Sequence, residues 1–546
     1  MKKLFALSTP FVFALILAGC GSGSSSNNSA DTPVTIPVVA QAELCAAPRP
    51  AGTIDPLTGV AYGDVPGTLN DEMKWIAYYV NQTYLWYGDV VPVSPASYFI
   101  GATVPYVDPS DNTASTEKVT SNYMVVDAYF NSQRSTKFTA SGKPLDQFHF
   151  TYQTTDYVAQ TSQGVQLGFG FEVALLSASP PRQALVAYVE PGSPAAVAGI
   201  VRGTQFISIN GVDVANGTDL TTLNDGLFTP VTGTTYNFVV QIPGVSGQTQ
   251  IPLTPANITS TPVMNVTTLP APNNNIGYIL YTDQIATAES ELIDAVNQLQ
   301  AANGGAGVTD LVLDLRYNGG GYLDLASELA YMIAGPGPTT GKFFEQDTYN
   351  NKNPFGLTTA QATVPFHSTA QGFSATTGQP LPQLNLSTLY VITSAGTCSA
   401  SEAIINGLRG VGVKVVQIGE TTCGKPYGFY PQDNCGTTYF TIQFKGVNYQ
   451  NFGDYADGFI PGGTGTTANN LPGCAATDDF TKQLGDPAEA SLATTLYYKN
   501  NNGACPSPAL GMSRGSVQNR HAGPVLHRSP IRENRILRPI SNLPMQ

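Results

Sequence analysis

The chain has 546 residues, more than one ordinary domain holds and suited to two to four domains. Its hydrophobic fraction of 42% supports a sizeable core, whereas its charged fraction of 12% is about half the usual value of about 25%. The net charge of −13 argues against a nucleic-acid partner. Residues 509–546 hold six Arg and one Glu, a charge of +5, which leaves −18 for the rest of the chain.

The N-terminus has the features of an export signal. Lys2 and Lys3 precede an apolar run that meets Cys20 and is too short to cross a bilayer as a permanent helix. The sequence LAGC at residues 17–20 resembles the bacterial lipobox, in which the cysteine is lipidated and the peptide before it is removed. An ordinary secretory signal with an incidental cysteine is the alternative. Residues 21–50 are expected to be a disordered linker, because they begin with uncharged Ser, Gly and Asn.

The resemblance to a lipobox predicts a lipid-anchored protein of the bacterial cell envelope, with a signal peptide over residues 1–20 and Cys20 as the lipidated residue. Gly21, rather than Asp, follows that cysteine and favours the outer membrane, where the chain would face the periplasm or the cell surface. A membrane is therefore an expected partner, through the lipid anchor, and nucleic acid is not.

The remaining six cysteines predict disulfides, because their number is even and the chain is predicted to be exported. Six cysteines allow 15 pairings. Cys423 with Cys435 is the first choice, since the two flank a plausible hairpin; Cys398 with Cys423 is the rival. The sequence contains no CxxC pair or Cys/His cluster, so a structural zinc site is not expected.

Residues 51–160 are predicted to form a mainly helical cap. Met73, Ile76, Tyr79 and Val80 recur at helical spacing and predict one buried helix face. The aromatic stretch YLWYGD also lies in this region.

Residues 161–258 change character and alternate apolar and polar residues, as short strands do. A short helix is expected to start at Ser193, with Pro194 at its first position, and Asn210 with Gly211 predicts a hairpin turn. This segment resembles a PDZ domain. The resemblance implies that GFGF (Gly168, Phe169, Gly170, Phe171) is the loop that binds a terminal carboxylate.

Residues 259–508 alternate strand and helix patterns and predict an α/β domain, a mixed sheet with crossover helices. In such sheets, sites form where parallel strands end. Two conspicuous turns fall at such ends: the glycines that close at Gly321 and the small residues around Ser399.

Three motifs in this domain, in order and behind the PDZ-like segment, resemble the C-terminal processing peptidases, or tail-specific proteases: DLRYNGGG (314–321), SASE (399–402) and GETTCGK (419–425). The N-terminal aromatic segment is similar to the cap of lipoprotein members. The resemblance implies a serine endopeptidase that needs no metal or other cofactor. Its partners would be unfolded or exported proteins, which the PDZ domain binds by their C-termini.

The resemblance places the nucleophile at Ser399, and Lys425 is the better candidate for its base. A serine hydroxyl needs a base, and neither His149 nor His367 lies in a recognisable motif. A Ser-His-Asp triad assembled in space stays open. A lysine acts as a base only if burial lowers its pKa, and the uncharged neighbours of Lys425 fit such a place.

The backbone N–H of Ala400 lies at the start of the predicted helix, where it can stabilise an oxyanion. By resemblance, Gly321 supplies the second N–H. Two structural alternatives stay open. Ser399 could be only a helix N-cap, since Glu402 three residues later completes a capping box, and the glycine turn could be only a strand-to-helix connection.

One departure from the family supports other functions. Phe429 stands where members often carry a Gln that orients the lysine. This motivates an inactive, PDZ-containing binding lipoprotein as an alternative, and an apolar-ligand-binding protein on the same fold is a third reading. Cys398 beside Ser399 raises a thiol nucleophile, although a disulfide is its simpler use. The tail 509–546 is predicted to be a disordered cationic arm or a reading-frame artefact.

Overall fold

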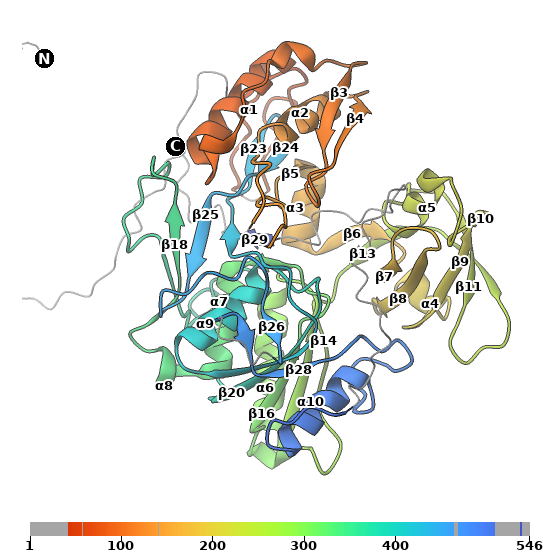
Figure 1. The fold of residues 1–546 in the computed structure, drawn as a ribbon, viewed down its shortest axis with the longest axis vertical. Helices are drawn as coiled ribbons and strands as arrows, with labels where there is room; N and C mark the ends of the chain where they lie inside the picture. Colours follow the sequence, from red (N-terminus) through yellow and green to blue (C-terminus); the bar gives the residue numbers. More distant parts are fainter. Residues whose placement is uncertain (1–41, 57, 140, 463–467, 508–534, 538–546) are drawn as a thin grey trace, which may run out of the picture. The chain divides into compact units, whose positions relative to one another are not determined.

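The computed structural model describes residues 42–56, 58–139, 141–462, 468–507 and 535–537 (Figure 1). The predicted signal peptide, Cys20 and most of the linker lie outside these residues. Among the described helices, none is both long and apolar enough to cross a membrane.

The N-terminal region combines helices with short strands. Thr68 and Asp71 form a capping box at the start of α1, and the predicted face with Met73, Ile76 and Tyr79 is buried. Helices α1 and α2 are in contact. The elements of this region are β1 (Leu44–Cys45), β2 (Val65–Pro66), α1 (Leu69–Thr83), two 3₁₀ turns (Tyr87–Asp89 and Pro95–Ser97), β3 (Thr103–Val107), β4 (Ala114–Lys118), α2 (Asn122–Asn131), β5 (Phe150–Gln153) and α3 (Thr154–Gln163).

The segment that resembles a PDZ domain forms an antiparallel sheet in the order β12-β11-β9-β8-β7. Ser193 caps α4 with Pro194 at the first position, and Asn210 and Gly211 connect β9 to β10, as the sequence predicts. Phenylalanines fill its separate core. Its elements are β6 (Val165–Gly168), β7 (Phe171–Ser177), β8 (Gln183–Val189), α4 (Pro194–Val197), β9 (Gln205–Ile209), β10 (Val212–Asp213), α5 (Leu220–Leu227), β11 (Tyr236–Gln241), β12 (Thr249–Leu253) and β13 (Ala256–Thr259).

The central sheet has the order β14-β15-β16-β20-β21-β28, with β14 antiparallel and the other strands parallel. The predicted mixed sheet with helices is therefore confirmed. Its main elements are β14 (Val263–Thr268), β15 (Ile276–Tyr281), α6 (Ala288–Gly305), β16 (Asp310–Asp314), β17 (Gly320–Tyr322), α7 (Leu323–Ala334), α8 (Pro336–Thr339), β20 (Thr388–Thr393), α9 (Ala400–Gly410), β21 (Lys414–Gly419), β28 (Gly473–Ala475) and α10 (Ala490–Asn500).

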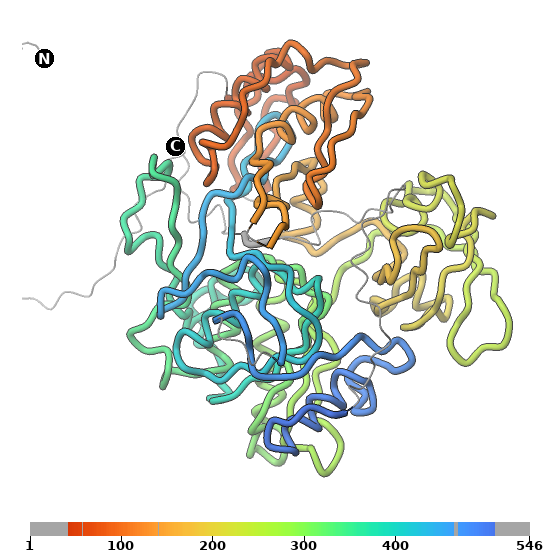
Figure 2. The backbone as a smooth tube through the Cα atoms, viewed as in Figure 1, coloured from red at the N-terminus to blue at the C-terminus, as the bar shows by residue number. Residues whose placement is uncertain are grey.

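Both faces of this sheet are buried, so its strands read as continuous apolar runs. Along β16, Leu311 and Leu313 belong to the core shared with α6, α7 and α9, whereas Val312 belongs to the core shared with α10. This alternation places helices on the two faces of the sheet (Figure 2).

Smaller sheets join the N-terminal region to the catalytic segment. Strand β5 pairs with β24, which pairs with β23, and β22 pairs with β25 beside β18. The cap is thus hydrogen-bonded to the chain that follows Lys425. These strands are β18 (Phe343–Tyr349), β19 (Thr363–Pro365), β22 (Tyr427–Gly428), β23 (Gln432–Asn434), β24 (Thr437–Phe440), β25 (Phe444–Val447), β26 (Ile460–Pro461) and β27 (Asn470–Leu471).

Most of the predicted basic tail, 509–546, lies outside the described residues. Its described part, Arg535–Leu537, is strand β29, which pairs in parallel with β17.

Candidate active site

Ser399 occupies a strained turn between β20 and α9. Its backbone has φ 64° and ψ −119°, a region that glycine favours and other residues adopt at a cost of about 1–3 kcal/mol. The side chain is fully buried, and its hydroxyl has no hydrogen-bond partner among the described residues. At the same time, a capping box between Ser399 and Glu402 is present at the start of α9, as the alternative interpretation predicts. Backbone strain at a buried serine is typical of a functional position, although the hydroxyl forms no hydrogen bond to the amine of Lys425 in this structure.

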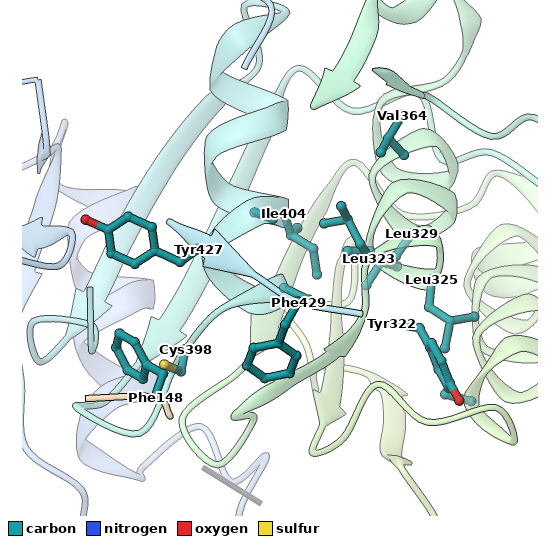
Figure 3. Close-up of a cluster of buried hydrophobic side chains, with 14 of the residues drawn as sticks. Phe148, Tyr322, Leu323, Leu325, Leu329, Val364, Cys398, Ile404, Tyr427 and Phe429 are labelled. Carbon is teal, nitrogen blue, oxygen red and sulfur yellow. The ribbon is translucent and has the colours of Figure 1, made fainter. Parts of the chain in front are cut away.

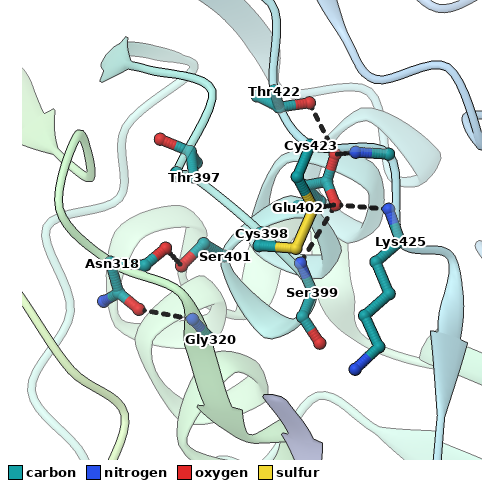
Figure 4. The surroundings of a disulfide bond; sticks show 12 residues. Asn318, Gly320, Thr397, Cys398, Ser399, Ser401, Glu402, Thr422, Cys423 and Lys425 are labelled. Atoms are coloured by element: carbon teal, nitrogen blue, oxygen red, sulfur yellow. Dashed lines mark hydrogen bonds between the residues drawn. A yellow bond between two sulfur atoms is a disulfide. The ribbon is translucent and has the colours of Figure 1, made fainter. Parts of the chain in front are cut away.

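Asn318, in the NGGG turn, joins that turn to the Ser399 turn (Figure 4). Its backbone carbonyl accepts from the N–H of Cys398 at 3.2 Å and from the hydroxyl of Ser401 at 3.2 Å. Its side-chain oxygen accepts from the N–H of Gly320 at 2.9 Å. The sequence analysis assigned no role to Asn318, although it stands inside the motif.

Gly321 can only be a glycine in this backbone. Its φ is +148°, and a Cβ at this position would lie 2.1 Å from the carbonyl oxygen of Gln284. The backbone N–H of Gln284 donates to the carbonyl of Gly320, and the backbone carbonyl of Gln284 accepts from the N–H of Tyr322. Since N–H and C=O groups alternate in direction along a strand, those of Gly321 face away from Gln284. Ala400 is the first residue of α9, so its N–H has no partner within the helix.

Glu402 is the carboxylate that fixes both candidate catalytic residues. It is fully buried and accepts from the backbone N–H groups of Ser399 at 3.0 Å and Lys425 at 2.8 Å. It also accepts from the N–H of Gly424 at 2.9 Å and the hydroxyl of Thr422 at 2.5 Å. Burial raises the pKa of Glu402, and the four hydrogen bonds oppose that rise. The sequence identified Glu402 only as a capping residue.

A disulfide between Cys398 and Cys423 ties the same two turns together, with the Cα atoms 5.2 Å apart. The first choice of pairing, Cys423 with Cys435, is wrong, and the rival pairing is confirmed. Cys435 lies in the tight turn between β23 and β24 with φ 58°, and it bonds Cys45 instead. The third pair is Cys474 with Cys505.

The disulfide also bears on metal binding and on the thiol alternative. Cys398, Glu402 and Cys423 place possible ligand atoms within 4.8 Å of one another. Both sulfurs are joined, however, and neither carries the thiolate that binds a metal or attacks a carbonyl.

Lys425 is fully buried, and Figure 3 shows Phe148 and Phe429 within the buried hydrophobic cluster of this region. Its amine lies 4.1 Å from the ring centroid of Phe429 and 4.8 Å from that of Phe148. Figure 4 shows the side chains of Ser399 and Lys425 extending to the same side of their two turns. Burial disfavours the ammonium form, whereas the ring faces favour it. Phe429 thus replaces a hydrogen-bonding glutamine with a contact to its ring face.

The two described histidines serve other partners. His149 is buried, bonds the carbonyl of Phe130 at 2.9 Å and lies 3.6 Å from Asp146; burial lowers its pKa. His367 bonds Asp324 at 2.8 Å. Neither bonds Ser399, so no Ser-His-Asp triad forms among the described residues. His521 and His527 lie outside them.

The GFGF residues connect the end of β6 at Gly168 to the start of the edge strand β7 at Phe171. Phe169 and Phe171 are buried and stack at 5.4 Å between ring centroids. Gly170 has φ +85°, and a Cβ there would lie 2.1 Å from that of Ser193. In the part of the chain that the structure describes, β7 pairs only with β8. A cavity of about 960 Å³ borders GFGF, β7 and the end of α5, and reaches Cys423.

Parts of the chain are similar to known proteins. Residues 275–430, which contain all three motifs, match the model of Peptidase family S41. Two curated relatives, both carboxyl-terminal-processing proteases, align with part of the chain. The Picosynechococcus sp. protein is 29% identical over 48% of this chain and 53% of its own length. The Synechocystis sp. protein is 28% identical over 43% of this chain and 47% of its own length.

The chain thus spans about half the length of the curated relatives it matches. A solved structure from Bacteroides fragilis NCTC 9343, provisionally assigned as an S41 protease, covers 81% of this chain and 98% of its own. Its TM-score is 0.53 at 22% identity, which supports a shared fold. These matches support the predicted class: residues 275–430 match Peptidase family S41, a family of serine-type peptidases.

Proposed function

We propose that the chain is a serine endopeptidase with Ser399 as nucleophile and Lys425 as general base. One observation carries the proposal: a single buried carboxylate, Glu402, holds the backbone of both residues. The disulfide between Cys398 and Cys423 is a second link between the turns that carry Ser399 and Lys425. Such duplication is expected where two side chains must meet with little freedom.

The reaction follows from this arrangement. The Ser399 oxygen bonds to the substrate carbonyl carbon while the Lys425 amine takes the hydroxyl proton. The carbonyl becomes an oxyanion, which the N–H groups of Gly321 and Ala400 stabilise. The C–N bond then breaks, and the leaving amine takes the proton from Lys425. Water attacks the acyl-enzyme, gives a proton to Lys425 and releases the acid, and that proton returns to Ser399.

Recognition of substrate C-termini is assigned to the PDZ-like segment. Support comes from the position of β7 as the edge strand of its sheet, beside the GFGF loop and α5, because peptide ligands are bound by addition of a strand to a sheet edge. The substrates would be unfolded or exported proteins. The Cys20 anchor and the envelope location belong to the same proposal, on the lipobox alone.

The test is cleavage of an unstructured protein by matched variants. Ser399→Ala and Lys425→Ala should each lower kcat/KM by at least about 1,000-fold. Ser387→Ala and Lys414→Ala, at exposed positions, are the controls and should cleave normally. Full activity of Ser399→Ala would refute the proposal.

An inactive binding protein is the second candidate, favoured by the ring contact between Phe429 and the amine of Lys425, which stabilises the ammonium form. A serine-directed phosphonate separates the two. Covalent labelling of Ser399 supports the peptidase, and no adduct between pH 6 and pH 10 supports the binding protein.

A further inference from the structure

The strand β29 lies where a bound polypeptide would meet the catalytic elements. It pairs in parallel with β17, with Ile536 opposite Gly321. It also contacts β22, which follows Lys425, and α9, which follows Ser399. Figure 4 shows this violet strand beside the green strand that begins at Gly320, below Ser399 and Lys425.

The backbone directions make this pairing specific to the candidate oxyanion hole. Gln284 occupies one side of β17, through the carbonyl of Gly320 and the N–H of Tyr322. The N–H and C=O of Gly321 therefore face the other side, where β29 lies. A substrate whose carbonyl reaches the N–H of Gly321 must approach from this same side.

The charge of the tail complements that of the cavity that borders GFGF and reaches Cys423, two residues before Lys425. The tail 509–546 carries +5, and the rest of the chain −18. The lining of the cavity is predominantly acidic: Asp108, Asp127, Glu172, Glu190, Asp283, Glu420 and Asp478, against the single cation Arg316. Arg316 is itself bonded to Asp314, Asp478 and Glu489. Opposite charges of this size draw a basic segment towards an acidic cavity.

The segment before β29 is also long enough for this strand to reach β17. Twenty-seven residues, 508–534, separate the described body from β29, and an extended chain of that length spans up to roughly 90 Å.

We propose that the basic C-terminal tail binds in the substrate groove of its own chain, with Arg535–Leu537 added to β17, and competes there with protein substrates. The same complementarity assigns basic polypeptide segments as the preferred occupants of the groove. Competition rests on the proposed peptidase function, whereas occupancy of the groove does not.

The first experiment compares two full-length variants. Ile536→Pro/Leu537→Pro removes two backbone N–H groups and breaks strand pairing, whereas Ile536→Ala/Leu537→Ala keeps them. We expect the Pro variant to cleave an unstructured protein with a roughly 10-fold lower KM, as when a tail with a Kd of about 100 μM is tethered at about 1 mM. The Ala variant should behave like the unaltered chain. Equal KM values for all three proteins would overturn the proposal.

A second measurement does not depend on catalysis. A labelled peptide of residues 531–546 should bind the Pro variant that also carries Ser399→Ala, and more weakly at 1 M than at 0.1 M salt. A scrambled peptide of equal charge is the control. If the peptide binds but no variant cleaves protein, the proposed peptidase function is refuted and the proposed binding of the tail is upheld. Activity without binding would refute the tail alone, and equal binding of the scrambled peptide would refute strand addition.

Discussion

The Ser399–Lys425 site and the GFGF region differ in what holds their backbone in place. Around Ser399, Glu402 and Asn318 use buried hydrogen bonds to fix three turns, and a disulfide repeats the constraint. Around GFGF, by contrast, β7 is the edge strand of its sheet and borders a cavity. The groups proposed to react are thus fixed by buried bonds, whereas the strand proposed to bind the substrate lies at the edge of its sheet. Four variants test this contrast.

The largest effect is expected at Glu402. Glu402→Ala leaves four buried donors without an acceptor, at about 1–3 kcal/mol each for an unsatisfied group. We expect the free energy of unfolding to fall by several kcal/mol and activity to be lost. Glu402→Gln keeps one acceptor oxygen, so its free energy of unfolding and its activity should lie between those of the unaltered chain and those of Glu402→Ala. Denaturant unfolding and cleavage rates measure the two effects, and an active Ala variant would show that other bonds position Ser399 and Lys425.

Removing each of two disulfides that close loops of similar length can distinguish an effect on stability from an effect on the positions of the catalytic residues. Cys398 and Cys423 are 25 residues apart, and Cys474 and Cys505 are 31 apart. Replacing either pair by Ala should cost about 3 kcal/mol of unfolding free energy. Only the first pair flanks the catalytic turns, so only its loss should also lower kcat for the folded enzyme. Equal kcat values would make the first disulfide purely structural.

Phe429→Leu tests the ring contact of the lysine. The ring stabilises the ammonium by about 1 kcal/mol, and its loss should let the amine give up its proton at lower pH. The acid limb of the pH profile of kcat/KM should therefore move to lower pH by about 0.7 unit. Phe440→Leu, which removes a core ring without contact to the amine, is the control. A shift to higher pH contradicts the role given to Phe429.

The smallest effect is expected in the recognition region. Gly170→Ala forces a Cβ against Ser193, whereas Gly192→Ala at a similar φ of +72° meets nothing within 4 Å. Both pay the backbone strain of about 1–2 kcal/mol. Only Gly170→Ala should raise KM for protein substrates, by several-fold, with kcat unchanged. A matching rise in Gly192→Ala would assign the effect to strain alone.

Much of the fold was predictable because its signals are local. The strands and helices of the α/β segment follow from apolar runs and glycine turns, and the cap of α4 from Ser193 with Pro194. Ser399, Lys425 and Gly321 were identified because they stand in contiguous motifs. These assignments of role remain predictions until variants are measured.

The missed features depend on contacts between distant segments. Asn318 and Glu402 act by accepting hydrogen bonds across 83 and 23 residues, and such partners leave no periodic signal in the sequence. The pairing of Cys435 with Cys45 joins segments 390 residues apart, and no local pattern in the sequence marks it. Strand β29 was missed because three residues between two long polar stretches carry no strand pattern.

The bond between Cys45 and Cys435 has a consequence for biosynthesis. It closes a span of 390 residues and encloses the whole Cys398–Cys423 loop. If Cys20 is lipidated as proposed, a chain that oxidises its remaining cysteines in the order of their emergence would join Cys45 to Cys398 and leave Cys435 without its correct partner. Efficient maturation therefore calls for an oxidoreductase able to reshuffle non-consecutive pairs, and a host that lacks one should accumulate mispaired, protease-sensitive product.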